Sequence, residues 1–154
     1  MTILSQTAID RFWTDGAVTV ENAVTSDELA GLLREFSILA EESRAHDGYY
    51  GKALDGRPRF DVQQGHSADQ AALRRVQAPT EISEAYFQIM SDSRMTDMVA
   101  DLIGPDVKHH HNKINSKRPG AATEVKWHQD FPFTPHTNTD LVTALLMIDE
   151  VTDE

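Results

Sequence analysis

Apolar residues recur with helical spacing through the first two-thirds of the chain. Ile9, Phe12 and Trp13 share one face at i, i+3 and i+4, which predicts a short helix that ends at Asp15-Gly16. A longer helix is predicted from residue 25 to about residue 44, because the run Thr-Ser-Asp-Glu at its start has the spacing of a capping box. The apolar stripe of this second helix consists of Leu29, Leu32, Leu33, Phe36 and Leu39.

The middle of the chain alternates between shorter elements and a glycine-rich loop. Short strands are predicted over residues 17–20 and 73–77, and two helices follow, one capped by Thr80 and one over residues 95–103. Residues 46–65 hold four glycines and a proline, which predicts a long loop with a short strand at 59–62. Long loops inside compact domains are often functional, so this one is either a substrate-facing lid or an ordinary surface excursion.

Strand patterns replace helical ones after Pro105. Strands are predicted over residues 107–116 and 125–130, with a turn at 117–120 between them. Residues 141–148 form a continuous apolar run of strand length, which predicts a strand buried on both faces. Helices followed by strands indicate one α+β domain over residues 1–154 with an antiparallel sheet.

Composition narrows the classes of partner. The chain has 25 acidic and 14 basic residues and a formal charge of −11, which argues against nucleic acids and anionic membranes. It has no cysteine, which excludes disulfides, cysteine-ligated metals and thiol catalysis. No apolar run approaches the ~20 residues that span a bilayer, and the first residues lack the pattern of a signal peptide. We therefore expect a cytoplasmic protein.

The run Trp-His-Gln-Asp at residues 127–130 carries the clearest chemistry. On a strand, His128 and Asp130 would point to the same face with Cα atoms roughly 6.5 Å apart, so both could reach one metal ion. Imidazole plus carboxylate is part of the ligand set of non-haem Fe(II). A bare pair with this spacing is common by chance, and an ordinary surface histidine is the alternative.

Three segments together resemble the phytanoyl-CoA dioxygenase family of Fe(II)- and 2-oxoglutarate-dependent oxygenases. They are FWTDGAVTVENAVTSDELAGLL, HHHNKINSKRPG and WHQDFPFTPHTNTDLVTALLMIDEVTDE, and the resemblance covers nearly the whole chain. It implies a cupin-like jelly roll, or double-stranded β-helix, in which His128 and Asp130 are the first two iron ligands. It also places Lys113 and Arg75 near the 2-oxoglutarate, and Leu145 where some members have a tryptophan against it. No catalytic residue beyond these ligands is implied.

The family pattern also includes a third iron ligand, a histidine, and an arginine that anchors 2-oxoglutarate, both downstream of the motif. Because the printed sequence stops at Glu154, we expect the N-terminal part of a longer oxygenase, with an incomplete barrel and little activity alone. The implied reaction is the hydroxylation by O2 of an unactivated C–H bond in a small organic substrate. Two alternatives are a non-catalytic fragment or interaction module, and a cupin-type metal protein that does not use 2-oxoglutarate.

The remaining histidines are weaker candidates. Of His109, His110 and His111, only the first and third would share a face of a strand, so an ordinary strand is the favoured interpretation. His136 lies beyond the motif on a predicted loop, where it could line the substrate mouth or, less favoured, act as a third ligand. His46 and His66 have no predicted partner.

Overall fold

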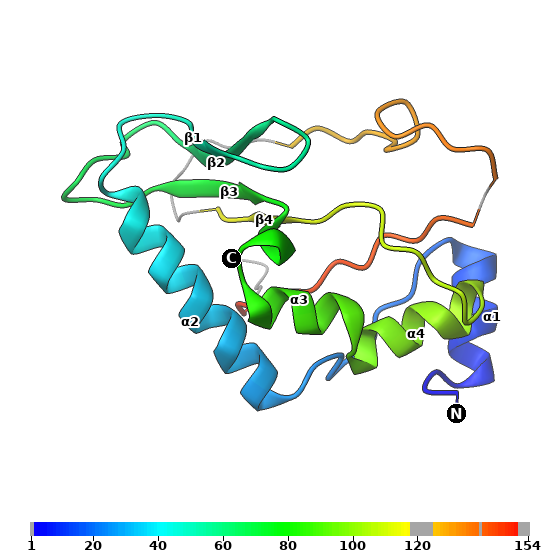
Figure 1. The fold of residues 1–154 in the computed structure, drawn as a ribbon. Coiled ribbons are helices and arrows are strands. Elements are labelled where there is room, and N and C mark those ends of the chain that lie inside the picture. Colours follow the sequence, from blue (N-terminus) through cyan, green and yellow to red (C-terminus); the bar gives the residue numbers. More distant parts are fainter. Residues whose placement is uncertain (1, 118–124, 139, 151–154) are drawn as a thin grey trace.

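The chain folds into a layer of helices packed against one face of a small antiparallel sheet (Figure 1). The computed structural model describes residues 2–117, 125–138 and 140–150. The helices are α1 (Gln6–Asp15), α2 (Ser26–Ser43), α3 (Glu84–Ser91) and α4 (Arg94–Ile103), with a 3₁₀ turn η1 (Pro79–Glu81) before α3. The strands are β1 (Tyr50–Lys52), β2 (Pro58–Val62), β3 (Leu73–Gln77) and β4 (Lys113–Asn115), and they neighbour one another in that order.

Local capping explains where the helices begin. The predicted capping box of α2 is confirmed, since Glu28 N donates to Thr25 Oγ1 over 3.2 Å and Thr25 N donates to Glu28 Oε2 over 2.6 Å. Ser83 rather than Thr80 caps α3, because Thr80 lies inside the 3₁₀ turn. Gly16 ends α1 in the left-handed conformation with φ of 79°, which a residue without Cβ adopts at little cost.

The core lies between the sheet and α2 and α3. Leu39 of α2 meets Phe60, Leu73, Val76 and Ile114 of the strands, and the side chain of Val76 is completely buried. Partly buried residues complete this cluster: Phe36, Tyr50, Val62 and Tyr86. The sheet therefore has one apolar face, which the helices cover.

The opposite face of the sheet is polar. Phe60 pairs with Val76 and Val76 with Ile114, so the residues between them alternate to the other side. That side carries Arg59, Asp61, Arg75, Gln77 and Lys113, which makes it the basic face of the molecule.

Arg59 fastens one end of this face. Its guanidinium group donates to Lys52 O over 3.0 Å, to Gln77 O over 3.1 Å and to Ala78 O over 2.8 Å, and it pairs with the Glu81 carboxylate. The residue is only 6% exposed. One side chain thereby joins β1, the end of β3 and η1.

The N-terminal residues are held by α4. Asp101 Oδ2 accepts hydrogen bonds from Ile3 N over 2.6 Å and Leu4 N over 2.8 Å, and Leu4 is buried. This contact places α1 beside α4, where Figure 1 shows the two helices crossing. Within the described residues, no helix is both long enough and apolar enough to cross a membrane.

Several sequence predictions need correction. Residues 17–20, 125–130 and 141–148 are not strands, and the strand predicted over 107–116 shrinks to Lys113–Asn115. A strand requires a hydrogen-bonded neighbour, and in the described structure no strand lies beyond β4 or β1 to provide one. The strand at 73–77 is confirmed and the one at 59–62 begins one residue earlier, whereas β1 was missed. Most of the predicted turn at 117–120 lies outside the described residues.

These findings support an α+β fold compatible with a cupin-like protein. Four short strands in one sheet do not make a jelly roll, so that part of the fold stays a prediction.

Candidate functional site

His128 and Asp130 converge in the structure, although not on a strand. Their segment is irregular up to residue 129 and turns at Asp130, whose carbonyl oxygen accepts from Phe133 N over 2.9 Å and Thr134 N over 3.1 Å. His128 Nε2 lies 3.4 Å from Asp130 Oδ1. The turn therefore brings the two side chains together where the sequence predicted a strand pleat.

The hydrogen bond of His128 Nδ1 determines which ring nitrogen could bind a metal ion. His128 Nδ1 lies 2.7 Å from Lys126 O, and a carbonyl oxygen can only accept, so Nδ1 carries the proton. In the neutral ring Nε2 then directs a lone pair toward the Asp130 carboxylate. A metal-ligating histidine commonly donates its second N–H to a backbone carbonyl in this way.

The pair fits two ligands of one divalent metal ion. Two ligands at right angles and ~2.1 Å from a metal lie about 3 Å apart, close to the 3.4 Å between Nε2 and Oδ1. Nε2 and a carboxylate oxygen repel each other when nothing lies between them, and either a proton or a cation removes that repulsion. About half of each side chain is exposed, which leaves the open side of such a site accessible.

The described residues do not supply a third ligand. They contain no group of three or more histidine, cysteine, aspartate or glutamate side chains placed to hold a metal. His136 Nδ1 instead donates to Thr134 O over 2.8 Å, and its ring meets that of Phe131 edge to face. It therefore does not join His128 and Asp130 in the described structure.

The three consecutive histidines are also not gathered around a site. Residues 109–112 precede β4 without forming a strand, and Nδ1 of His110 lies 2.6 Å from Nδ1 of His111. Burial, and then the neighbouring His110, lower the pKa of His111. The alternation of faces assumed from the sequence does not apply because the segment is irregular.

Lys113 and Arg75 lie on the polar face of the sheet. Lys113 is opposite Gln77 and Arg75 is opposite Asn115, so the two cations are diagonal neighbours on adjacent strands. Lys113 is exposed, whereas Arg75 Nη2 already binds Asp61 Oδ2 over 2.7 Å. Asp61 was not predicted from the sequence, and its alternation with Phe60 in β2 was the signal that could have identified it.

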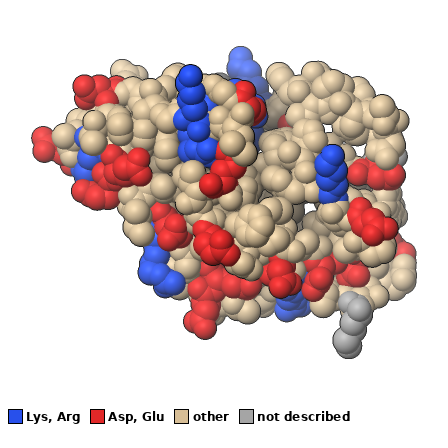
Figure 2. Space-filling model, viewed as in Figure 1, with Lys and Arg blue, Asp and Glu red and all other residues tan. Residues whose placement is uncertain are grey.

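Charge is divided between the sheet and the helices. The strands carry five cations against a single carboxylate, Asp61, whereas α1 to α4 carry ten carboxylates against three arginines. Figure 2 shows the acidic side chains spread along the helical side of the molecule. An anionic ligand would therefore meet an attractive potential at the sheet and a repulsive one at the helices.

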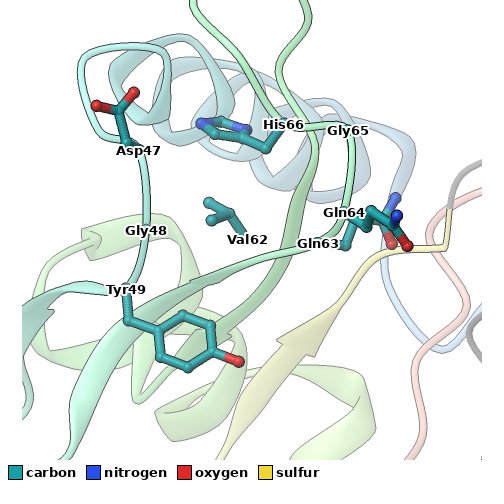
Figure 3. Close-up of a pocket in the computed structure, with 8 residues that line it drawn as sticks. All are labelled: Asp47, Gly48, Tyr49, Val62, Gln63, Gln64, Gly65 and His66. Atoms are coloured by element: carbon teal, nitrogen blue, oxygen red, sulfur yellow. The ribbon is translucent and has the colours of Figure 1, made fainter.

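The glycine-rich loop forms an open hollow of about 400 Å³ between residues 47–49 and 62–66 (Figure 3). The side chain of Val62 stands in the middle of the hollow, with Asp47 and His66 on one side and Tyr49 on the other. His66 fastens the loop, because its Nε2 lies 3.0 Å from Ser43 O and 2.9 Å from His46 O while its Nδ1 accepts from Ala72 N over 2.8 Å.

The histidines of this loop thus have partners that the sequence did not reveal. Besides the bonds of His66, the ring of His46 stacks on Tyr50 with centroids 3.6 Å apart, and Tyr50 stacks on Phe60. Burial raises the pKa of Tyr50 to about 12. A long-range contact between loops has no local pattern, so sequence reasoning had no means to find it.

Comparison with known proteins identifies the family of this chain. The sequence model of the phytanoyl-CoA dioxygenase family matches residues 12–154, which include His128, Asp130, Lys113 and Arg75. The chain belongs to the phytanoyl-CoA dioxygenase family. The resemblance inferred from the sequence is confirmed.

Two curated proteins similar to the chain are named as dioxygenases. The chain is 29% identical over 140 residues to a probable alpha-ketoglutarate-dependent hypophosphite dioxygenase of Stutzerimonas stutzeri, covering 90% of the chain and 46% of that protein. It is 27% identical over 124 residues to an ectoine dioxygenase of Streptomyces coelicolor, covering 80% of the chain and 36% of that protein. The chain thus spans less than half the length of these curated relatives.

Proposed function

We propose that this chain supplies two iron ligands, His128 and Asp130, to an Fe(II)- and 2-oxoglutarate-dependent dioxygenase that acts on a small molecule. The observation that supports this most strongly is the geometry of the pair. In the neutral ring, the hydrogen bond from Nδ1 to Lys126 O leaves the lone pair on Nε2, which lies 3.4 Å from Asp130 Oδ1. The family match gives that geometry its chemical meaning.

In this proposal, metal binding and 2-oxoglutarate binding fall to two different regions of the described structure. When bound, Fe(II) with 2-oxoglutarate and O2 supplies the oxidising chemistry, and the protein orients the reactants. His128 and Asp130 would hold the metal, while Lys113 and Arg75 would attract the 2-oxoglutarate dianion on the basic face. The named substrates of the two relatives, hypophosphite and ectoine, differ widely, so the substrate is proposed only as a small molecule. Hydroxylation of an unactivated C–H bond is the proposed reaction for an organic substrate.

Binding of Mn(II), a redox-stable substitute for Fe(II), tests the metal site directly. We expect the chain to bind Mn(II) weakly, because the described residues offer two ligands, and His128→Ala to reduce the affinity by about tenfold or more. Titration followed by electron paramagnetic resonance measures the bound fraction. His136→Ala is the matched control, since this half-buried loop histidine does not contact His128 or Asp130 through any hydrogen bond in the described structure. Equal Mn(II) binding by wild type and His128→Ala would contradict the proposal.

Formation of succinate separates the dioxygenase from its alternatives. The 154-residue chain alone is expected to form little succinate from Fe(II), 2-oxoglutarate and O2, because no third ligand joins the pair among the described residues. A longer polypeptide that contains the chain and a complete iron site should form it in a His128-dependent manner. A cupin-type metal protein would bind the metal without forming succinate.

A second function, association with another polypeptide, is favoured by one feature. Large apolar side chains are exposed throughout residues 125–147: Val125, Trp127, Phe131, Phe133, Leu141, Leu145 and Met147. Contiguous exposed apolar surface often marks an interface. Sedimentation of the chain, compared with a variant in which Trp127 and Phe133 are replaced by serine, tests whether this surface mediates association.

A further inference from the structure

Asp61 binds two arginines on the polar face of the sheet. Its Oδ2 lies 2.7 Å from Arg75 Nη2 and 3.6 Å from Arg74 Nη2. The Asp61 side chain is only 9% exposed, whereas those of Arg74 and Arg75 are 37% and 32% exposed. The carboxylate is therefore the buried anchor, and the two guanidinium groups extend from it toward the surface.

A β-bulge explains why both arginines reach the same carboxylate. Asp61 pairs with Arg75, but the next residue, Val62, pairs with Leu73, so Arg74 is an extra residue in β3. In a regular strand the side chains of Arg74 and Arg75 would point to opposite faces. The bulge removes that alternation locally, and such bulges commonly re-aim a side chain near functional sites.

The cluster is incompletely satisfied by the protein. Within the described part of the chain, Asp61 Oδ1 and Arg75 Nε are buried and have no hydrogen-bond partner. Buried polar groups of this kind are rare in proteins, because each costs free energy that a partner would recover. A cluster that retains this cost, and still presents guanidinium groups at the surface, is better suited to binding a ligand than to stabilising the sheet.

The charges of the cluster define the kind of ligand. Arg74, Arg75 and the diagonal neighbour Lys113 carry three positive charges, and Asp61 cancels one of them. Two positive charges remain on one face, which matches a dianion. A dicarboxylate also offers several oxygen acceptors to guanidinium donors that hold a fixed orientation.

We propose that Asp61 is a positioning residue that orients Arg74 and Arg75 so that, with Lys113, they bind a dicarboxylate. The identity of that dicarboxylate as 2-oxoglutarate rests on the proposed function, whereas the orientation of the arginines by Asp61 does not require the metal. Asp61 itself does not touch the ligand. Its effect is transmitted through the guanidinium groups.

Replacement of Asp61 by asparagine gives opposite results for a positioning residue and for a mere neighbouring charge. If Asp61 only repelled anions, Asp61→Asn would tighten binding of 2-oxoglutarate. If Asp61 orients the arginines, the variant should bind about tenfold more weakly, comparable to the loss of one charge-assisted hydrogen bond. Titration of the ¹⁵N-arginine-labelled chain with 2-oxoglutarate, without metal, reports the dissociation constant and the Nε–Hε signals of Arg74 and Arg75.

Two further variants make this test specific. Asp55→Asn removes an exposed carboxylate that pairs with Arg57 in the turn between β1 and β2, and it should leave binding unchanged. Asp61→Glu keeps the charge and should bind 2-oxoglutarate more tightly than Asp61→Asn does. If Asp61→Asn does not fold, Asp61→Ser, which also removes the charge, replaces it as the decisive variant. Wild-type affinity in the decisive variant, or tighter binding, overturns the proposal, as does the absence of any 2-oxoglutarate-dependent shift in the wild-type chain.

The outcome is separable from that of the proposed function. Asp61-dependent binding of 2-oxoglutarate without His128-dependent binding of Mn(II) would support the positioning role and contradict the iron site. His128-dependent binding of Mn(II) with no effect of Asp61→Asn on 2-oxoglutarate would do the reverse.

Discussion

Apolar side chains are buried in one region of the chain and exposed in another. The first region is the packed part, residues 2–117, and the second is the motif segment, residues 125–150. In the first, Leu32 of α2 and Val76 of β3 are only 1% and 0% exposed. In the second, Leu145 is 71% exposed and Trp127 is fully exposed. Both segments are rich in apolar residues, so hydrophobicity alone does not decide burial. A buried side chain also needs a partner surface, which the first region builds from its own helices and strands.

The largest test of this contrast uses the same substitution in both regions. Leu32→Ala should lower the free energy of unfolding by about 3 to 5 kcal/mol, because it leaves a cavity in a closely packed core. Leu145→Ala should change it by less than about 0.5 kcal/mol, since little apolar contact is lost there. Urea unfolding followed by circular dichroism measures both. Equal effects would show that the motif segment is part of the cooperative core.

Removal of the Arg59 side chain should lower the free energy of unfolding nearly as much as a cavity in the core does. Arg59→Ala is expected to lower the free energy of unfolding by about 3 kcal/mol, because three backbone carbonyls and Glu81 lose their buried partner. Arg57→Ala, which breaks only the exposed pair with Asp55, should cost less than about 1 kcal/mol. A loss at Arg59 no greater than that at Arg57 would refute its role as the link between β1, β3 and η1.

Low pH should weaken the ion pair between Arg59 and Glu81, with a smaller loss of stability than Arg59→Ala causes. The hydrogen bond from Arg59 lowers the pKa of Glu81 below its usual value of 4.5. A carboxyl group whose pKa is lowered on folding stabilises the protein above the unfolded pKa, and that contribution is lost as pH falls through the folded pKa. Glu81→Gln should therefore reduce the difference in unfolding midpoint between pH 6 and pH 3, roughly the range over which carboxylates titrate. An unchanged difference would argue against the contribution of this carboxylate.

The smallest expected effect concerns backbone conformation. Ala78 adopts φ of 47°, a left-handed conformation that an L-residue with Cβ rarely accepts. Ala78→Gly should raise the free energy of unfolding by about 0.5 kcal/mol, because relief of that strain exceeds the added chain entropy. Ala40→Gly, inside α2, should instead lower it by about 1 kcal/mol. The same sign for both in thermal unfolding would contradict the strain at Ala78.

Sequence reasoning succeeded where the determinants are local. A helix closes its hydrogen bonds within one segment. The capping box of Thr25 and Glu28 and the stop at Gly16 can therefore be predicted from adjacent residues. A strand depends on a neighbour elsewhere in the chain, which is why residues 125–130 and 141–148 were wrongly predicted. The convergence of His128 and Asp130 was anticipated for the wrong reason, since a turn rather than a pleat produces it.

The candidate site, too, was predictable from the sequence only where its residues are close together in the chain. His128 and Asp130 could be proposed as metal ligands from the sequence because both lie within three consecutive positions. Asp61 was missed because its contact with both Arg74 and Arg75 depends on a bulge between β2 and β3, which no local sequence pattern indicates. The bonds of His66 to Ser43, His46 and Ala72 likewise arise only when separate loops meet.

The strand order β1-β2-β3-β4 has a consequence for biosynthesis. Each strand pairs with the strand that precedes it, so each can add to an existing edge as soon as it leaves the ribosome. All helices and strands of the described structure lie within residues 6–115, ahead of the Trp-His-Gln-Asp run in the order of synthesis. The growing polypeptide can thus present the basic face of these strands to the segment that carries His128 and Asp130, so the first region can act as a template for the second.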